Sequence, residues 1–119
     1  MIENLKKLQE LKKCYDNHKD KVPIPDIALE HMKYIIEQCH IHNLPQPEIF
    51  PYIGGGGLQA EWEYDWYIEI DSNKNGISML CVKGKDYKNS IECDFSNIKC
   101  AFLLLREFLK HIVRMNEKE

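Results

Sequence analysis

The sequence predicts an α+β domain: an antiparallel four-stranded meander with two N-terminal helices and one C-terminal helix packed on one face, in the order α-α-β-β-β-β-α. From Leu58 to Asp71 every even position is apolar, and every odd position except Tyr67 is polar or acidic. That period of two indicates β-structure with one buried and one solvated face. Apolar residues at helical spacing flank this region on both sides, and turn signals divide it.

Two helices are expected before the sheet. An apolar residue at every third position predicts a first helix that fades near Asn17, its stripe being Ile2, Leu5, Leu8 and Leu11. Pro23 and Pro25 exclude helix from the linker that follows, and Pro25-Asp26 begins the second helix, because proline is tolerated in a first turn. The core face of this second helix follows i, i+3/i+4 spacing: Ala28, Leu29, Met32, Ile35, Ile36 and Cys39.

The four strands are expected at about 58–63, 67–71, 77–82 and 90–94. Tyr64-Asp65-Trp66 is the predicted bend between the first two, and a three-residue loop leaves Glu63 opposite Tyr67. Asn75-Gly76 marks the next turn and Gly84-Lys85-Asp86 the last. The segment 48–53 is compatible with a short edge strand, since Pro51 lacks an N–H for a ladder.

The last helix carries the widest apolar stripe of the chain. Ser96-Asn97 precedes it and can cap it. Leu103 and Leu104 lie outside the main stripe, so this helix has apolar surface to spare for a homodimer contact. The stripe itself consists of Ile98, Ala101, Phe102, Leu105, Phe108, Leu109, Ile112 and Val113.

Length and charge indicate one domain without a general affinity for polyanions. The 119 residues suit a single α+β domain over 1–119, in which the helical segment 1–22 is semi-independent. A net charge of −3 does not favour nucleic acid or an anionic membrane as a partner. Residues 58–94 hold eight Asp or Glu against four Lys, so the predicted sheet is its acidic part.

Cysteine usage indicates free thiols in a reducing compartment. The five cysteines form no CxxC pair, and apolar neighbours predict burial of Cys39, Cys81 and Cys100. The N-terminal segment is charged and lacks an apolar signal core, and no run approaches the length of a membrane span. We therefore expect a cytoplasmic protein.

The solvated face of the predicted hairpin is the main candidate site. Its polar residues share one parity and are expected to project from one side: Glu61, Glu63, Asp65, Tyr67, Glu69 and Asp71. Three interpretations remain open. The carboxylates are a solvated surface that discourages edge aggregation, a docking surface for a basic partner, or the ligands and acid–base groups of a metal-dependent hydrolase.

Other motifs favour structure over chemistry. Gly54–Gly57 precedes a strand rather than a helix and is followed by no Lys-Ser or Lys-Thr, which favours a permissive turn over a phosphate loop. Cys39, His40 and His42 are metal-type residues without a second pair, so a site would need His111 or Cys100 brought close by the fold. By their parity Trp62, Tyr64 and Trp66 are expected to face the helices.

A resemblance adds to this interpretation. The segment 23–71 combines Pro23-Ile-Pro25, then Asn43-Leu-Pro45-Gln-Pro47, then the glycines with Glu61-Trp62 and Ile68-Glu69-Ile70. It resembles small uncharacterised bacterial and phage proteins that have a Pro-x-Pro linker and a Gly-Gly…Glu-Trp β-hairpin and occur in mobile or defence-related gene neighbourhoods. The resemblance implies an accessory role beside another protein, such as an antitoxin, an immunity factor or a phage inhibitor, and it transfers no catalytic residue.

The expected function is therefore a non-catalytic interaction domain that needs no cofactor. Its acidic face would bind and modulate a basic protein, such as one that processes nucleic acid, without contacting nucleic acid or membrane itself. Tyr67 is the expected aromatic anchor among the carboxylates. The alternatives are a small divalent-metal-dependent hydrolase that uses the same carboxylates and a structural homodimer formed through the last helix.

Overall fold

The computed structural model of the chain describes residues 1–84 and 87–117. Its elements follow in the order α1 (Ile2–Asp16), α2 (Asp26–Ile41), β1 (Glu48–Pro51), β2 (Gly57–Glu63), β3 (Tyr67–Asn73), β4 (Gly76–Val82), the 3₁₀ helix η1 (Tyr87–Asn89), β5 (Ile91–Phe95) and α3 (Ile98–Glu117). The predicted α+β class and the three helices are confirmed.

The sheet has five antiparallel strands in the order β1-β2-β3-β4-β5, so the predicted number of four is wrong. The additional strand is β1, which pairs with β2 from Glu48 opposite Glu61 to Pro51 opposite Leu58. It lies at the edge of the sheet, where a proline is tolerated. Four residues are too few for a clear alternation, and the pairing with β2 is what makes this segment a strand.

The predicted register of the hairpin formed by β2 and β3 is confirmed. Glu63 lies opposite Tyr67, so residues 64–66 form the three-residue bend. Asn73 pairs with Gly76, which leaves a two-residue turn, and the backbone of Gly76 has a φ of 137° that favours glycine. Both β3 and β5 extend beyond their expected ends, to Asn73 and Phe95. Of the predicted turn after β4, Lys85 and Asp86 lie outside the described residues.

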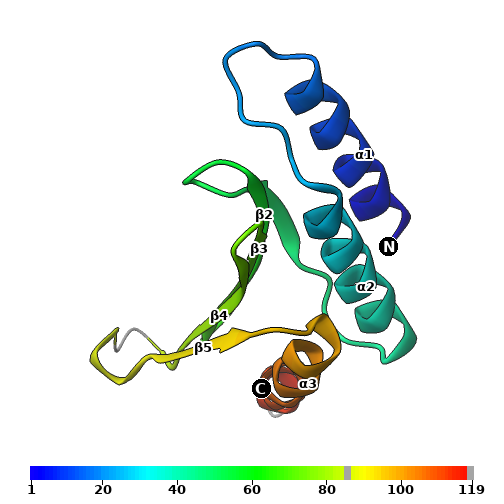
Figure 1. Cartoon of the computed structure of the whole chain (residues 1–119). Helices are drawn as coiled ribbons and strands as arrows, with labels where there is room; N and C mark the ends of the chain where they lie inside the picture. Colours follow the sequence, from blue (N-terminus) through cyan, green and yellow to red (C-terminus); the bar gives the residue numbers. More distant parts are fainter. Residues whose placement is uncertain (85–86, 118–119) are drawn as a thin grey trace.

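The three helices lie on one side of the sheet, as Figure 1 shows. The helix α2 packs against β2 and β3, α3 packs against β4 and β5, and α1 packs against α2 and the edge strand β1. The core between these layers includes Met32, Ile35, Trp62, Ile70 and Leu105, all with almost no exposed surface. The opposite face of the sheet has no helix over it in Figure 1.

Both apolar and polar contacts attach α1 to the rest of the domain. Leu8 is its one fully buried residue, and the half-buried Leu5, Leu11 and Tyr15 also pack against the core. Lys12 donates a hydrogen bond of 2.8 Å to the carbonyl of Ile24 and forms ion pairs with Asp16 and Asp26 at 3.3 and 3.4 Å. At α3 the predicted cap is confirmed, since Asn97 Oδ1 accepts a hydrogen bond of 2.7 Å from the N–H of Lys99.

Two side-chain predictions differ from the structure. Cys100 is exposed, because it lies on the solvent side of the first turn of α3. Tyr64 is 45% exposed, because strand alternation does not extend through the bend in which it lies. Trp66 faces the helices as predicted: it is half-buried against the core, and its ring stacks on His111 of α3 with 4.3 Å between centroids. Trp62 is buried as predicted, as are Cys39 and Cys81.

Candidate functional site

Seven carboxylates project from the side of the sheet opposite the helices. They occupy alternate positions on four strands, and we call this surface the acidic face: Glu48, Glu61, Glu63, Glu69, Asp71, Glu92 and Asp94. The register aligns two rows across it. One runs Glu48–Glu61–Glu69–Leu80–Glu92 and the other runs Phe50–Gln59–Asp71–Ser78–Asp94.

A hydrogen-bonded cluster lies where these rows cross β2 and β3. Gln59 Nε2 donates to Glu61 Oε1, and it also donates to Glu69 Oε1 at 2.9 Å. The Tyr67 hydroxyl donates to the same Glu69 oxygen at 2.7 Å. Glu69 therefore accepts one hydrogen bond from Gln59 on β2 and one from Tyr67 on its own strand, β3. These two bonds hold its carboxylate in one position on the face. Burial, together with the hydrogen bond and charge of Glu69, raises the pKa of Tyr67 and keeps the phenol protonated.

Asp71 is the most enclosed carboxyl group of the acidic face. It is 9% exposed, and its Oδ1 has no hydrogen-bond partner among the described residues. Burial raises its pKa to about 8, and its hydrogen bond with Glu69 and the charges of Glu69 and Glu61 act in the same direction. At neutral pH this carboxyl group is therefore largely protonated, and its Oδ1 has no hydrogen-bond partner in the described part of the chain.

The face is hollowed beside Asp71. A cavity of about 280 Å³ opens over β3, β4 and β5, and its lining includes Glu69, Asp71, Ser78, Leu80, Glu92 and Asp94. A second hollow of about 170 Å³ lies over β1 and β2 and is lined by residues including Glu48, Glu61 and Glu63. The expectation that this face is solvated is therefore wrong at its centre, where Gln59 and Asp71 are buried.

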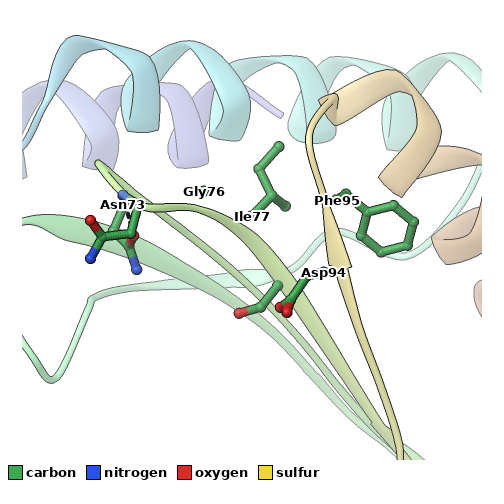
Figure 2. Close-up of a pocket in the computed structure, with 7 residues that line it drawn as sticks. Asn73, Gly76, Ile77, Asp94 and Phe95 are labelled. Carbon is green, nitrogen blue, oxygen red and sulfur yellow. Dashed lines mark hydrogen bonds between the residues drawn. The ribbon is translucent and has the colours of Figure 1, made fainter.

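A third hollow, of about 260 Å³, lies at the turn between β3 and β4 and is the one drawn in Figure 2. Ile77 points toward the helices there and Asp94 points to the opposite side, so the picture shows how alternate residues divide between core and acidic face. Apart from Asp94 its lining is uncharged, and it includes Asn73, Gly76, Ile77 and Phe95. This hollow carries no set of reactive side chains.

The six predicted site residues do not all meet. Glu61, Tyr67, Glu69 and Asp71 gather in or beside the cluster, and Glu63 lies exposed at the end of β2. Asp65 lies in the bend, exposed and beyond the paired strands. Tyr67 is half-buried and hydrogen-bonded to Glu69, so it offers less free aromatic surface than an exposed anchor would.

Sequence reasoning missed three members of the face: Glu48, Glu92 and Asp94. The last two alternate with Ile91, Cys93 and Phe95, and this pattern was the available signal for β5. Glu48 had no such signal, because only its pairing with Glu61 places it in the row.

The metal-type residues near the end of α2 are not arranged as a metal site. Within residues 1–84 and 87–117, no three His, Cys, Asp or Glu side chains are grouped so that they could hold a metal ion. Burial raises the pKa of the Cys39 thiol to about 12, and His42 lies against Phe102 with 5.8 Å between ring centroids. His111 is engaged with Trp66 instead, and Cys100 is exposed.

Ser72 and His31 form a pair that the sequence did not indicate. His31 Nδ1 lies 2.7 Å from Ser72 Oγ, on the helix side of β3. Ser72 has no exposed surface, and burial lowers the pKa of His31. A hydroxyl without access to solvent cannot attack a substrate, so this contact joins α2 to the sheet and satisfies a buried polar group.

The glycine run is a turn, as predicted. Gly55 and Gly56 have φ values of 80° and 73°, and the N–H of Tyr52 donates to the carbonyl of Gly57 at 3.0 Å as β2 begins. A Cβ on Gly57 would lie 2.4 Å from the carbonyl oxygen of Ser72 in β3. The glycines therefore allow a tight turn and a close approach of two strands, and no helix follows them to bind phosphate.

Comparison of this chain with protein-family models, curated proteins and solved structures finds no match. Its function is therefore inferred from charge and geometry.

No helix among the described residues is both long and apolar enough to cross a bilayer. Leu103 is 55% exposed on α3, but isolated exposed apolar side chains are ordinary and do not by themselves identify an interface. The acidic face, by contrast, gathers seven carboxylates on one side of the sheet, and we therefore take it as the candidate site.

Proposed function

We propose that this chain is a non-catalytic binding domain whose acidic face docks a basic protein partner. The observation that carries the proposal is the row Glu48–Glu61–Glu69–Leu80–Glu92, which aligns four carboxylates across the sheet. Like charges on adjacent strands destabilise a sheet by a few tenths of a kcal/mol or more per pair. A cationic partner would remove that repulsion.

The ion pairs found in the described part of the chain do not include the carboxylates of this row. The four ion pairs found among the described residues all join side chains of the helices: Lys12–Asp16, Lys12–Asp26, Arg106–Glu107 and Lys110–Glu107. A face of one sign without internal partners creates a field that attracts an oppositely charged protein and repels phosphates. This supports a protein partner over nucleic acid.

The arrangement supports binding better than hydrolysis. The carboxylates are spread over four strands, and in the described part of the chain they do not converge into a set of metal ligands. The carboxyl group with the largest pKa shift, Asp71, is enclosed beside Glu69, and none of the five described strands contains a histidine or lysine that could share proton transfer. An accessory role of antitoxin, immunity or inhibitor type is the form of this proposal that the resemblance of residues 23–71 favours.

The proposal is tested with an acetylated, amidated hexaarginine peptide as the basic probe. The test variant is Glu48→Gln/Glu92→Gln, which neutralises the two exposed ends of the row. The matched control is Glu10→Gln/Glu37→Gln, which removes the same charge from exposed positions on α1 and α2. Affinity is measured by calorimetry at low and at physiological ionic strength.

The face variant should weaken binding by about three- to tenfold at low salt, which corresponds to roughly 0.7–1.4 kcal/mol for two exposed charges. The control should change it by less than about twofold, since its charges are farther from the face and screened. Equal losses in the two variants, or an affinity that does not respond to salt, would contradict docking at the acidic face.

A further inference from the structure

We propose that the hollow beside Asp71 is a socket for one cationic side chain, a lysine ammonium or an arginine guanidinium, of the basic partner. This inference rests on the proposed function and names the point on the acidic face where the partner is anchored.

The two rows of the face give the hollow its chemistry. Glu69, Leu80 and Glu92 are aligned across β3, β4 and β5, and Asp71, Ser78 and Asp94 are aligned in the neighbouring row. In each row two carboxyl groups flank an uncharged residue of the middle strand. Adjacent strands are about 4.8 Å apart, so the acidic residues of β3 and β5 are separated by roughly 10 Å. A single cation between them approaches carboxyl groups from both sides.

The middle strand, β4, offers contacts for the methylene chain that carries the cationic group. Leu80 offers apolar surface to the methylene groups of a lysine or arginine, and the Ser78 hydroxyl offers a further acceptor. The volume of about 280 Å³ is limited, which favours one inserted side chain over a whole peptide segment.

Asp71 distinguishes this hollow from an ordinary group of surface acids. Its side chain is 9% exposed, it lines the hollow, and its Oδ1 lacks a hydrogen-bond partner in the described part of the chain. An unpaired buried acceptor costs about 1–3 kcal/mol, and most such groups in native proteins are satisfied. This oxygen has almost no exposed surface in the free protein, so a cationic N–H donor in the hollow would supply the missing partner once the Asp71 side chain turns its Oδ1 toward it.

Binding in this socket releases a proton. In the free protein Asp71 holds its proton at neutral pH, because burial and the neighbouring Glu69 and Glu61 raise its pKa to about 8. The other titratable groups around it are Glu92 and Asp94 on β5, whereas β4 contributes uncharged Ser78 and Leu80. A bound cation favours the carboxylate, so the pKa of Asp71 falls and affinity increases as the pH rises toward that value.

The experiment titrates the whole chain with the hexaarginine peptide, whose charge is constant over the pH range used. Wild-type affinity should increase by about three- to tenfold from pH 6 to pH 9, which corresponds to a pKa change of about half a unit to one unit on binding. The isosteric variant Asp71→Asn should abolish this pH dependence. Glu63→Gln serves as the control, because it removes a charge of the same face outside the hollow and should weaken binding while leaving the pH dependence intact.

A second measurement needs no variant. Calorimetry of the wild type at pH 7.5 in phosphate and in Tris, whose ionisation enthalpies differ, should show release of a fraction of a proton per peptide bound. Absence of proton release, or an Asp71→Asn variant with unchanged pH dependence, overturns the socket. If those results occur and Glu48→Gln/Glu92→Gln still weakens binding, docking at the acidic face is supported and only the proposed socket is disproved. If that double variant binds normally, the proposed function itself fails.

A free polyamine carries the same ammonium chemistry and is tested separately. Spermidine should bind more weakly than the peptide and should compete with it, since it lacks the contacts of a protein segment with the rest of the face. Tighter binding of spermidine than of hexaarginine, with a pH dependence that Asp71→Asn abolishes, would assign the hollow to a small molecule and overturn the partner side chain.

Discussion

Glu61 and Glu69 lie directly opposite each other on β2 and β3, and the side-chain amide of Gln59 donates to a carboxylate oxygen of each. Opposed like charges are unfavourable in a sheet, and one shared donor offsets only part of their repulsion. This pair lies in the row that holds four carboxylates, next to the enclosed Asp71. The hydrogen bonds from Gln59 thus make the pair tolerable in the folded sheet. The negative charge that they do not offset can attract a basic partner.

Replacing Glu61 by glutamine should stabilise the domain. The substitution removes the charge repulsion across β2 and β3 while its amide oxygen can still accept from Gln59. We expect the free energy of unfolding to rise by about 0.2–1 kcal/mol at pH 7 and low salt, and by less in high salt. Urea denaturation measures it, and Glu37→Gln on α2 is the control. A loss of stability would show that Gln59 requires a carboxylate at this position.

The variant Asp71→Asn should gain stability over the wild type as the pH rises. Between the unfolded pKa of 3.8 and the folded value of about 8, the folded protein retains a proton that the unfolded chain releases. The wild type therefore loses stability through that window, and asparagine does not titrate. The difference should be near zero at pH 4 and reach about 1–3 kcal/mol by pH 8. Denaturation at pH 4, 6 and 8 tests this, and a constant difference would contradict it.

Gly57→Ala should be strongly destabilising. The new methyl group would lie 2.4 Å from the carbonyl oxygen of Ser72, which belongs to the backbone of a central strand and cannot move without breaking the ladder. We expect a loss of about 2 kcal/mol or more. Gly54→Ala is the control, because its methyl group would meet a side-chain atom of Tyr52 at 2.8 Å, and a side chain can turn away. Thermal unfolding of both variants should separate them, and similar melting temperatures would disprove the steric explanation.

Trp62→Phe should destabilise the domain more than Trp66→Phe does. Trp62 is buried and its indole N–H donates to the carbonyl of Pro45 at 2.8 Å, which ties the linker before β1 to the sheet. Losing this hydrogen bond and part of the ring should cost about 2–3 kcal/mol. Trp66 is half-buried and lies against His111 and Phe108, so its replacement should cost about 1 kcal/mol. Equilibrium unfolding measures both, and the reverse order would contradict this assignment of the core.

Periodicity predicted most of the secondary structure, since the alternation from 58 to 71 and the helical stripes are local signals that tertiary packing preserved. The same alternation predicted the opposition of Glu63 and Tyr67. Prediction from periodicity failed where a segment is too short to show a pattern or where a bend interrupts the pattern. Residues 48–51 have too few positions to show a period, and Tyr64 lies in a bend where parity has no meaning.

The sequence by itself determined that residues 58–71 form β-structure, that one face of it is buried, and that the other is rich in acids, because side chains alternate between faces along any strand. Only the tertiary structure decided which carboxylates become neighbours. Glu48, Glu92 and Asp94 join the face through pairing between strands, and the enclosure of Asp71 between Gln59 and Ser78 depends on those pairings too. Beyond the register across the short bend between β2 and β3, which residues become neighbours and how deeply they are buried depend on contacts between segments that no local period encodes.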